Sequence, residues 1–175
     1  MAEMLTVRES TRDDIAAIES LYPEAFPDED LLPVVRDLLA DTIVAMSLVG
    51  TIDTQVAGHA IFTKCGVTGS SISASLLAPL AVAPRWQRQG IGSELVRAGL
   101  RRLGGTGVQR VFVLGDPTYY RRLGFHPENR VEPPYPLPAE WDGAWQSQRL
   151  SESAASCEGT LSVPPQWRQP ALWAP

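Results

Sequence analysis

The 175-residue chain has little cysteine and little histidine, and both shortages narrow the classes of protein that it can belong to. Cys65 and Cys157 are its only cysteines, too few for the disulfide framework of a small secreted domain. His59 and His126 are its only histidines, and their spacing from the cysteines matches no zinc finger. We therefore expect a reduced, cytoplasmic protein without a metal.

Long hydrophobic runs and an excess of basic residues are also missing. No apolar stretch approaches the roughly 20 residues of a membrane span, and the N-terminal segment lacks the basic and apolar regions of a signal peptide. The net charge is −5, whereas nucleic-acid binding needs a basic face. Lys64 is the only lysine, so Schiff-base chemistry would depend on this one residue. These absences predict a protein that binds neither membranes nor nucleic acid.

The length fits one domain with its own hydrophobic core, over residues 1–175. Within it we expect a core region at 1–130 and a Pro/Trp-rich extension at 131–175. Alternating apolar residues predict strands, and apolar residues three and four positions apart predict helices. Strands are expected at 4–10, 41–50, 55–66, 71–84 and 108–115, and a further strand starts within 125–131. Helices are expected at 11–22, 28–40, 89–105 and 116–124.

The extension is expected to add short strands at 144–150 and from 159 onward, on either side of a polar loop at 151–157. Four of the five tryptophans lie in the extension, namely Trp141, Trp145, Trp167 and Trp173. A disordered tail has few aromatic residues. We therefore expect most of the extension to pack on the core region.

The stretch RWQRQGIGSELV, residues 85–96, places Gly90 and Gly92 where a loop becomes a helix. A glycine inside a helix costs about 1 kcal/mol relative to alanine, so bare backbone must serve a purpose there. A helix N-terminus presents unpaired N–H groups, and a residue without Cβ lets an anion approach them. The two glycines therefore predict a site for a phosphate group, and a glycine turn without a ligand is the alternative.

Two other phosphate-binding motifs do not fit this stretch. A dinucleotide-binding fingerprint needs a third glycine where this chain has Leu95. A Walker A loop needs a lysine after the second glycine, and Ser93 follows Gly92 here.

The longer segment LAPLAVAPRWQRQGIGSELV resembles the acyl-CoA-binding segment of the GNAT superfamily of N-acyltransferases. Gln87, Gly90 and Gly92 match its pattern Gln/Arg-x-x-Gly-x-Gly/Ala. YYRRLGF at 119–125 resembles the second signature of the family, aromatic-Tyr-x-x-x-Gly-Phe. VLGDPTYYRRLGFHP looks especially like a small bacterial subgroup called YhbS-like. The resemblance covers residues 5–127.

The resemblance implies a mixed, mostly antiparallel central sheet with splayed central strands, flanked by helices. The splayed strands would be 73–83 and 108–114, and Pro79, which lacks an N–H, fits a break in the ladder. The co-substrate would be acetyl-CoA, with no metal. The implied cofactor-binding residues are Leu80, Ala81 and Val82 along the pantetheine arm, Gln87, Arg88, Gln89, Gly90, Ile91, Gly92 and Ser93 around the pyrophosphate, and Asp116 and Tyr119.

The implied reaction is direct transfer of an acetyl group from acetyl-CoA to a primary amine of a small molecule or a protein, in a ternary complex. Tyr120 matches the family tyrosine that protonates the leaving thiolate, with aromatic packing as the alternative. His59 is the candidate base, and the alternative is a core histidine with satisfied hydrogen bonds. Asp116 fits a helix cap better than a base.

Other interpretations stay open at this stage. Cys65 as a nucleophile would need a partner, and along an extended strand His59 would lie about 20 Å away. The acidic residues Glu24, Asp28, Glu29 and Asp30 either bind a cationic acceptor or form a solvated charged run. A catalytically silent CoA-binding sensor or scaffold, or an acyltransferase with a longer acyl donor, are the alternative functions. A homodimer in which the aromatic tail joins the interface is a further hypothesis.

Overall fold

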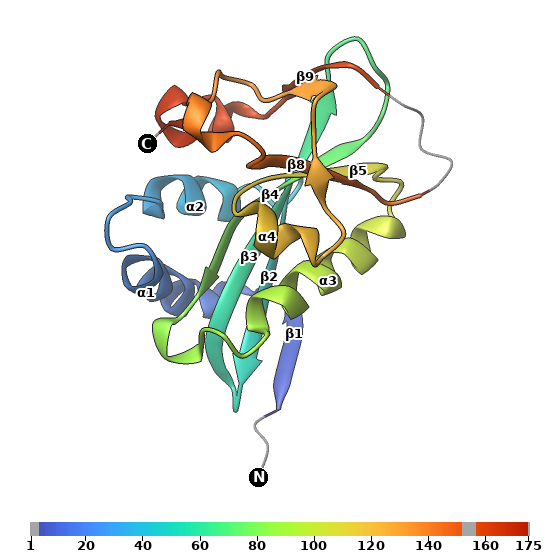
Figure 1. The fold of residues 1–175 in the computed structure, drawn as a ribbon. Helices are drawn as coiled ribbons and strands as arrows, with labels where there is room; N and C mark the ends of the chain where they lie inside the picture. Colours follow the sequence, from blue (N-terminus) through green and yellow to red (C-terminus); the bar gives the residue numbers. More distant parts are fainter. Residues whose placement is uncertain (1–3, 152–156, 175) are drawn as a thin grey trace. The chain divides into compact units, whose positions relative to one another are not determined.

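The computed structural model of the chain describes residues 4–151 and 157–174 (Figure 1). The chain forms two compact units. Unit 1 comprises the residues up to Phe62 together with Ala78–Gly99, and unit 2 comprises Thr63–Leu77 and the residues from Leu100 onward. Strands β3 (Gln55–Val67) and β4 (Ala74–Val82) and helix α3 (Ile91–Gly104) contribute residues to both units. The single domain over 1–175 stays a prediction.

The strands of unit 1 follow the order β1-β2-β3-β4. β1 (Leu5–Glu9) pairs antiparallel with β2 (Ala45–Ile52), and Leu5 lies opposite Ile52. A two-residue turn joins β2 to β3, with φ of 49° at Asp53 and 69° at Thr54. Two left-handed residues in succession give the twist that a tight hairpin needs.

The first strand of this hairpin begins and ends later than the sequence predicts. It was expected at 41–50 and forms at Ala45–Ile52. The Asp41 carbonyl accepts the Ala45 N–H at 3.0 Å, which closes a turn over the expected start. At the other end, Ile52 extends the strand because it pairs with Leu5 of β1.

Two helices, α1 (Ile15–Ala25) and α2 (Leu32–Leu39), follow β1 (Figure 1). The Thr11 N–H donates to the Asp14 carboxylate at 2.7 Å, which fixes the turn before α1. The prediction that the helix ends at residue 22 is wrong, because α1 continues through Pro23 to Ala25. Leu21 and Tyr22 are buried in that last turn, and their packing outweighs the one hydrogen-bond donor that proline lacks.

Neighbouring residues of β3 face the helices on opposite sides of the sheet in unit 1. A Cβ on Gly58 would lie 2.9 Å from Leu95 of α3, whereas the ring of His59 contacts Tyr22 of α1. This follows from the alternation of side chains along a strand. The core of unit 1 therefore has one layer under α3 and another under α1.

The strands of unit 2 follow the order β4-β5-β8-β6. Residues Ala74–Leu77 of β4 run parallel to β5 (Arg110–Leu114), two residues short of Pro79. β8 (Trp145–Arg149) runs antiparallel to both β5 and β6 (His126–Pro127). β9 (Gly159–Ser162) pairs antiparallel with the end of β3 and parallel with β7 (Val131–Glu132).

The strand expected to start within 125–131 does begin there, at His126, but it ends after two residues. The segment forms two short strands, β6 and β7, which pair with different partners. Between them the Glu128 carboxylate accepts the N–H groups of Arg130 and Val131 at 2.8 and 2.9 Å. This local turn redirects the chain.

The C-terminal tryptophans lie in the core of unit 2. Trp145, Trp167 and Trp173 are buried, and Trp173 packs edge-to-face against the other two. The Trp167 indole N–H donates to the Thr63 hydroxyl at 3.2 Å, and that of Trp145 donates to the Val131 carbonyl at 2.8 Å. Most of the expected polar loop at 151–157 lies outside the described residues.

The predicted fold class is confirmed: the sheet is mixed and mostly antiparallel, and helices flank it. Helix α4 (Pro117–Arg121) is shorter than the expected 116–124. Within the described ranges, no helix is both long enough and apolar enough to cross a membrane.

Candidate functional site

The loop between β4 and α3 is held by its own side chains. The Gln87 amide donates to the Val82 carbonyl at 3.0 Å, and the Arg85 guanidinium donates to Gln55 at 3.1 Å. The Ala83 N–H donates to the Ala57 carbonyl at 2.9 Å, which ties the start of the loop to β3. These bonds give the loop a defined path although most of its residues are exposed.

Two residues of this loop adopt left-handed backbone conformations, with φ of 62° at Arg88 and 83° at Gly90. A Cβ on Gly90 would meet nothing within 4 Å, so the glycine is needed for its conformation and the space beside it is open. The first hydrogen bond of α3 runs from the Glu94 N–H to the Gly90 carbonyl at 3.0 Å. The amides of Ile91 and Gly92 precede that bond at the positive end of the helix dipole. This arrangement suits an anion.

The strand before the loop alternates in burial. Ala81 is buried, whereas Leu80 and Val82 are half-buried. A Cβ on Gly58 would lie 3.1 Å from the Ala81 carbonyl as well as close to Leu95. Gly58 therefore lets α3 lie against the strands. The residues predicted to bind the pantetheine arm, 80–82, and those predicted to bind the pyrophosphate, 87–93, all belong to unit 1.

The other predicted residues, Asp116, Tyr119 and Tyr120, belong to unit 2. The Asp116 carboxylate accepts the Thr118 N–H at 2.9 Å, so it caps α4, the role favoured over that of a base. The Tyr120 ring lies edge-to-face against Tyr119 and Phe125, with centroids 4.9 and 5.6 Å away. Gly124, with φ of 95°, provides the turn from α4 to Phe125 that the second signature requires.

Tyr120 is 8% exposed. Burial raises the pKa of its phenol above the ordinary value, and Tyr119 and Asp116 add to the increase. The phenol therefore keeps its proton at neutral pH. A neutral phenol is the form that a general acid needs.

His59 is fully buried, and both of its ring nitrogens have partners. Nδ1 lies 2.7 Å from the Tyr22 hydroxyl, and Nε2 lies 2.7 Å from the Ser47 hydroxyl. Burial lowers the pKa of the imidazole to about 3, although Asp14 raises it slightly. This is the geometry of the alternative, a core histidine with satisfied hydrogen bonds, and it gives the base hypothesis no support.

Cys65 also lacks the properties of a nucleophile. Burial raises the pKa of its thiol to about 12, and the thiol donates to the Thr63 carbonyl at 3.3 Å. A reactive cysteine needs a lowered pKa, because the thiolate is the attacking form.

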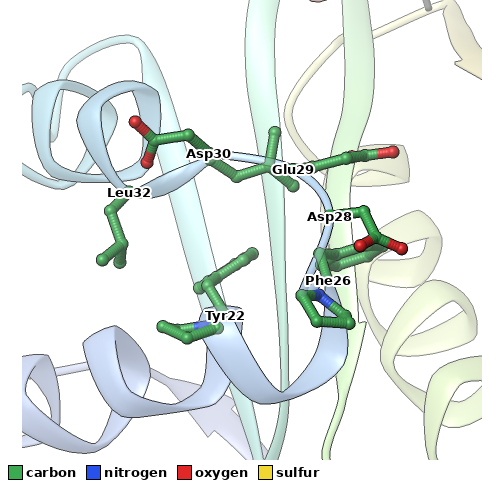
Figure 2. Close-up of a pocket in the computed structure, with 9 residues that line it drawn as sticks. Tyr22, Phe26, Asp28, Glu29, Asp30 and Leu32 are labelled. Atoms are coloured by element: carbon green, nitrogen blue, oxygen red, sulfur yellow. The ribbon is translucent and has the colours of Figure 1, made fainter.

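A pocket of about 400 Å³ lies between α1 and α2 in unit 1 (Figure 2). Its wall combines aromatic, proline, leucine and acidic residues, namely Tyr22, Pro23, Phe26, Pro27, Asp28, Glu29, Asp30, Leu31 and Leu32. Figure 2 shows the Asp30 carboxylate directed away from those of Asp28 and Glu29. The three exposed acids therefore form an anionic rim around an apolar pocket and do not converge on one point.

No group of three or more His, Cys, Asp or Glu side chains that could hold a metal ion occurs in the ranges 4–151 and 157–174. The cytoplasmic location and the homodimer stay predictions.

Sequence reasoning missed four residues that shape these sites. Gly58 leaves room for helix α3, and Gly115 leaves room for the ring of Tyr120. A glycine in a strand or at its end often marks such a close contact, so the sequence could have indicated both. Tyr22 and Ser47 satisfy His59. Nothing in the sequence indicates that pairing, because the residues lie 37 and 12 positions from the histidine and only the fold brings them together.

The mixed sheet and the glycine loop before α3 are those of an acetyltransferase. The chain is a member of the GNAT family of acetyltransferases. The family model of the acetyltransferase (GNAT) domain matches residues 42–127. The N-acetyltransferase YjhQ of Escherichia coli K12, itself uncharacterised, is 34% identical over 157 residues, which are 86% of this chain and 87% of YjhQ. YhbS of the same strain, another uncharacterised N-acetyltransferase, is 33% identical over 145 residues, 81% of this chain and 84% of YhbS. The family predicted from the two sequence signatures is confirmed.

Two solved structures agree in fold. The crystal structure of E. coli YhbS in complex with CoA has a TM-score of 0.87 and 28% identity, and the match covers 97% of this chain and 94% of that one. A GNAT acetyltransferase from Brucella melitensis in complex with acetyl-CoA has a TM-score of 0.75 and 27% identity, with 95% and 99% covered.

Proposed function

We propose that the protein transfers an acetyl group from acetyl-CoA to a primary amine of a small molecule or a protein, within a ternary complex. The observation that carries the proposal is the open, left-handed loop at Arg88 and Gly90 in front of α3. The complexes of two similar proteins with CoA and acetyl-CoA support the choice of co-substrate.

The pyrophosphate of acetyl-CoA binds at the amides that begin α3, and the pantetheine arm follows Leu80, Ala81 and Val82. The amine attacks the thioester carbonyl, a C–N bond forms and the C–S bond breaks. The cationic amine releases one proton to solvent before it attacks and a second when the C–S bond breaks. Tyr120 supplies a proton to the leaving thiolate and regains one from solvent. The Gln87 side chain donates to the Val82 carbonyl, so it holds the pyrophosphate-binding loop next to the strand that binds the pantetheine arm.

The acceptor pocket in this proposal is the one between α1 and α2. Its aromatic and proline residues suit the apolar body of an amine, and its rim of Asp28, Glu29 and Asp30 attracts a cation. An amine acceptor is cationic when it arrives at neutral pH, so the charge of the rim favours its encounter with the pocket.

A titration tests the co-substrate site. Wild-type protein should bind acetyl-CoA with a dissociation constant in the micromolar range by calorimetry, and Gly90→Glu should abolish binding because it adds a negative charge and a side chain at the anion site. Gly107→Glu is the matched control, since Gly107 also has a positive φ of 87° and open space beside it. Equal losses in both variants, or no loss in either, would contradict the site.

A catalytically silent CoA-binding module is the second candidate, and the satisfied hydrogen bonds of His59 favour it because they leave the reaction without an identified base. Release of free thiol from acetyl-CoA in the presence of amines distinguishes the two. A module binds acetyl-CoA in the titration and releases no thiol above the background with any amine.

A further inference from the structure

A chain of hydrogen bonds crosses unit 1 from α1 to the end of β1. The Tyr22 hydroxyl on α1 bonds to His59 Nδ1 on β3, and His59 Nε2 bonds to the Ser47 hydroxyl on β2, each at 2.7 Å. The Ser47 hydroxyl also lies 2.7 Å from that of Ser10, and the Ser10 N–H donates to the Ser47 carbonyl at 2.9 Å. The phenol of Tyr22 is thereby tied to β3, to β2 and to Ser10, the residue that follows β1.

Tyr22 is also part of the pocket between α1 and α2. Its ring stacks on that of Phe26, another lining residue, with centroids 6.2 Å apart and planes 19° apart. The Tyr22 ring also meets the His59 ring edge-to-face, with centroids 5.7 Å apart. The position of Tyr22 therefore determines where the aromatic wall of the pocket lies.

His59 is fully buried and is not among the residues that line the pocket. A buried imidazole that serves packing alone could be replaced by an apolar side chain, yet this one is held by two short hydrogen bonds on opposite sides of its ring. When one nitrogen accepts the Tyr22 proton, the other carries the hydrogen that Ser47 accepts. The pair of bonds thus fixes the ring plane, and the ring plane fixes the phenol.

We infer that His59 and Ser47 are positioning residues for the acceptor: they hold Tyr22, and through it Phe26, in the place that gives the pocket its affinity for the amine. This inference rests on the proposed function, since it takes the pocket as the acceptor site. It gives the buried histidine a role in substrate affinity in place of a role as a base.

The test measures KM for the amine, KM for acetyl-CoA and kcat by thiol release, with benzylamine, tyramine, spermidine and a lysine-containing peptide as probes. The amine that the wild type acetylates fastest is then used for every variant. Tyr22→Phe keeps the ring and removes its bond, and His59→Leu removes both bonds of the imidazole. Each should raise KM for the amine about tenfold, the effect of one lost buried hydrogen bond, and leave KM for acetyl-CoA unchanged.

His59→Asn is the conservative rescue. The asparagine carbonyl ends near the place of Nδ1, so Tyr22 keeps a partner and KM for the amine should return toward the wild-type value. The double variant Tyr22→Phe/His59→Leu should equal the stronger single variant, because both changes remove the same restraint.

Thr63→Val is the matched control for stability. Thr63 lies on β3, as His59 does, but it belongs to unit 2. Its substitution leaves the buried indole N–H of Trp167 without its acceptor. It should lower the melting temperature without changing KM for the amine.

Three results would overturn the inference: unchanged KM values in Tyr22→Phe and His59→Leu, equal changes in both KM values, or the same rise in Thr63→Val. These results differ from failure of the proposed function, in which the wild type releases no thiol with any of the amines. In that case the positioning role falls as well, because the pocket then has no acceptor.

Discussion

Gly115 lies directly against the ring of Tyr120: a Cβ on Gly115 would be 2.6 Å from Cε2 of the tyrosine. Glycine at the end of β5 therefore makes room for the residue that we propose as the general acid. The contact explains why the chain has a glycine immediately before Asp116, the cap of α4.

The first prediction concerns this contact. Gly115→Ala should displace the Tyr120 ring and lower kcat for thiol release by up to about 100-fold, because a displacement of about 1 Å costs this much in reactions that depend on positioning. Affinity for acetyl-CoA, measured by calorimetry, should change little. Gly66→Ala is the control, since a Cβ there meets nothing within 4 Å. A kcat equal to that of the control would argue against the contact having a catalytic role.

The second prediction concerns the phenol itself. Tyr120→Phe should lower kcat about 100-fold and leave the dissociation constant of acetyl-CoA unchanged, because only the proton for the thiolate is lost. Tyr119→Phe, at the neighbouring position of the same signature, should lower kcat far less than Tyr120→Phe, because the Tyr119 hydroxyl supplies no proton to the thiolate. Burial raises the pKa of Tyr120, so the acid should stay protonated throughout the neutral pH range. Full activity in Tyr120→Phe would assign the ring to packing alone.

The third prediction concerns the dependence of stability on pH. The pKa of His59 is about 3 in the folded protein and 6.5 in the unfolded chain, so the unfolded chain binds more protons between these values. The free energy of unfolding should therefore be highest above pH 6.5 and fall as the pH approaches 3, by up to about 1.4 kcal/mol per pH unit from this group. Urea unfolding between pH 7 and 4 measures the slope.

Two variants identify the group responsible for the slope. His59→Asn should flatten it between pH 6.5 and 4. The hydrogen bond with Arg8 lowers the pKa of Asp14 from 3.8 to about 2, so Asp14→Asn should alter only the dependence below about pH 4. An unchanged slope in His59→Asn would show that the imidazole titrates normally and is not buried as described.

The fourth prediction compares two glycines of α3. A Cβ on Gly99 would overlap the Phe62 ring, whereas a Cβ on Gly104 meets nothing within 4 Å. Gly104→Ala should therefore stabilise the protein by up to about 1 kcal/mol through helix propensity. Gly99→Ala should destabilise it by about 1–3 kcal/mol, because overpacking outweighs the same gain. Chemical denaturation measures both, and stabilisation by both substitutions would contradict the close packing of α3 on β3.

The sequence was most informative where a local pattern has a local cause. Several local features depend on neighbours a few residues away, namely the apolar face of α3, the glycines at its start, the cap at Asp116 and the turn at Gly124. The family signatures consist of such residues. Element boundaries were less predictable. A helix was expected over 11–22, and the burial of Leu21 and Tyr22 carries it through Pro23 to Ala25.

The roles of His59 and Gly115 could not be predicted in the same way. The partners of the histidine lie on another strand and on a helix, so the sequence alone offered His59 as a candidate base beside the commoner role of a core histidine and could not show its partners. A glycine is needed at position 115 because the ring of Tyr120, five residues later, packs directly against it.

The sequence by itself determined the family and predicted the left-handed turn before α3, because a loop conformation and a helix start are set by adjacent residues. Only the tertiary structure decided that His59 is a buried, neutral partner of Tyr22. The protonation and contacts of a buried group depend on what the fold packs around it, and those neighbours are distant along the chain.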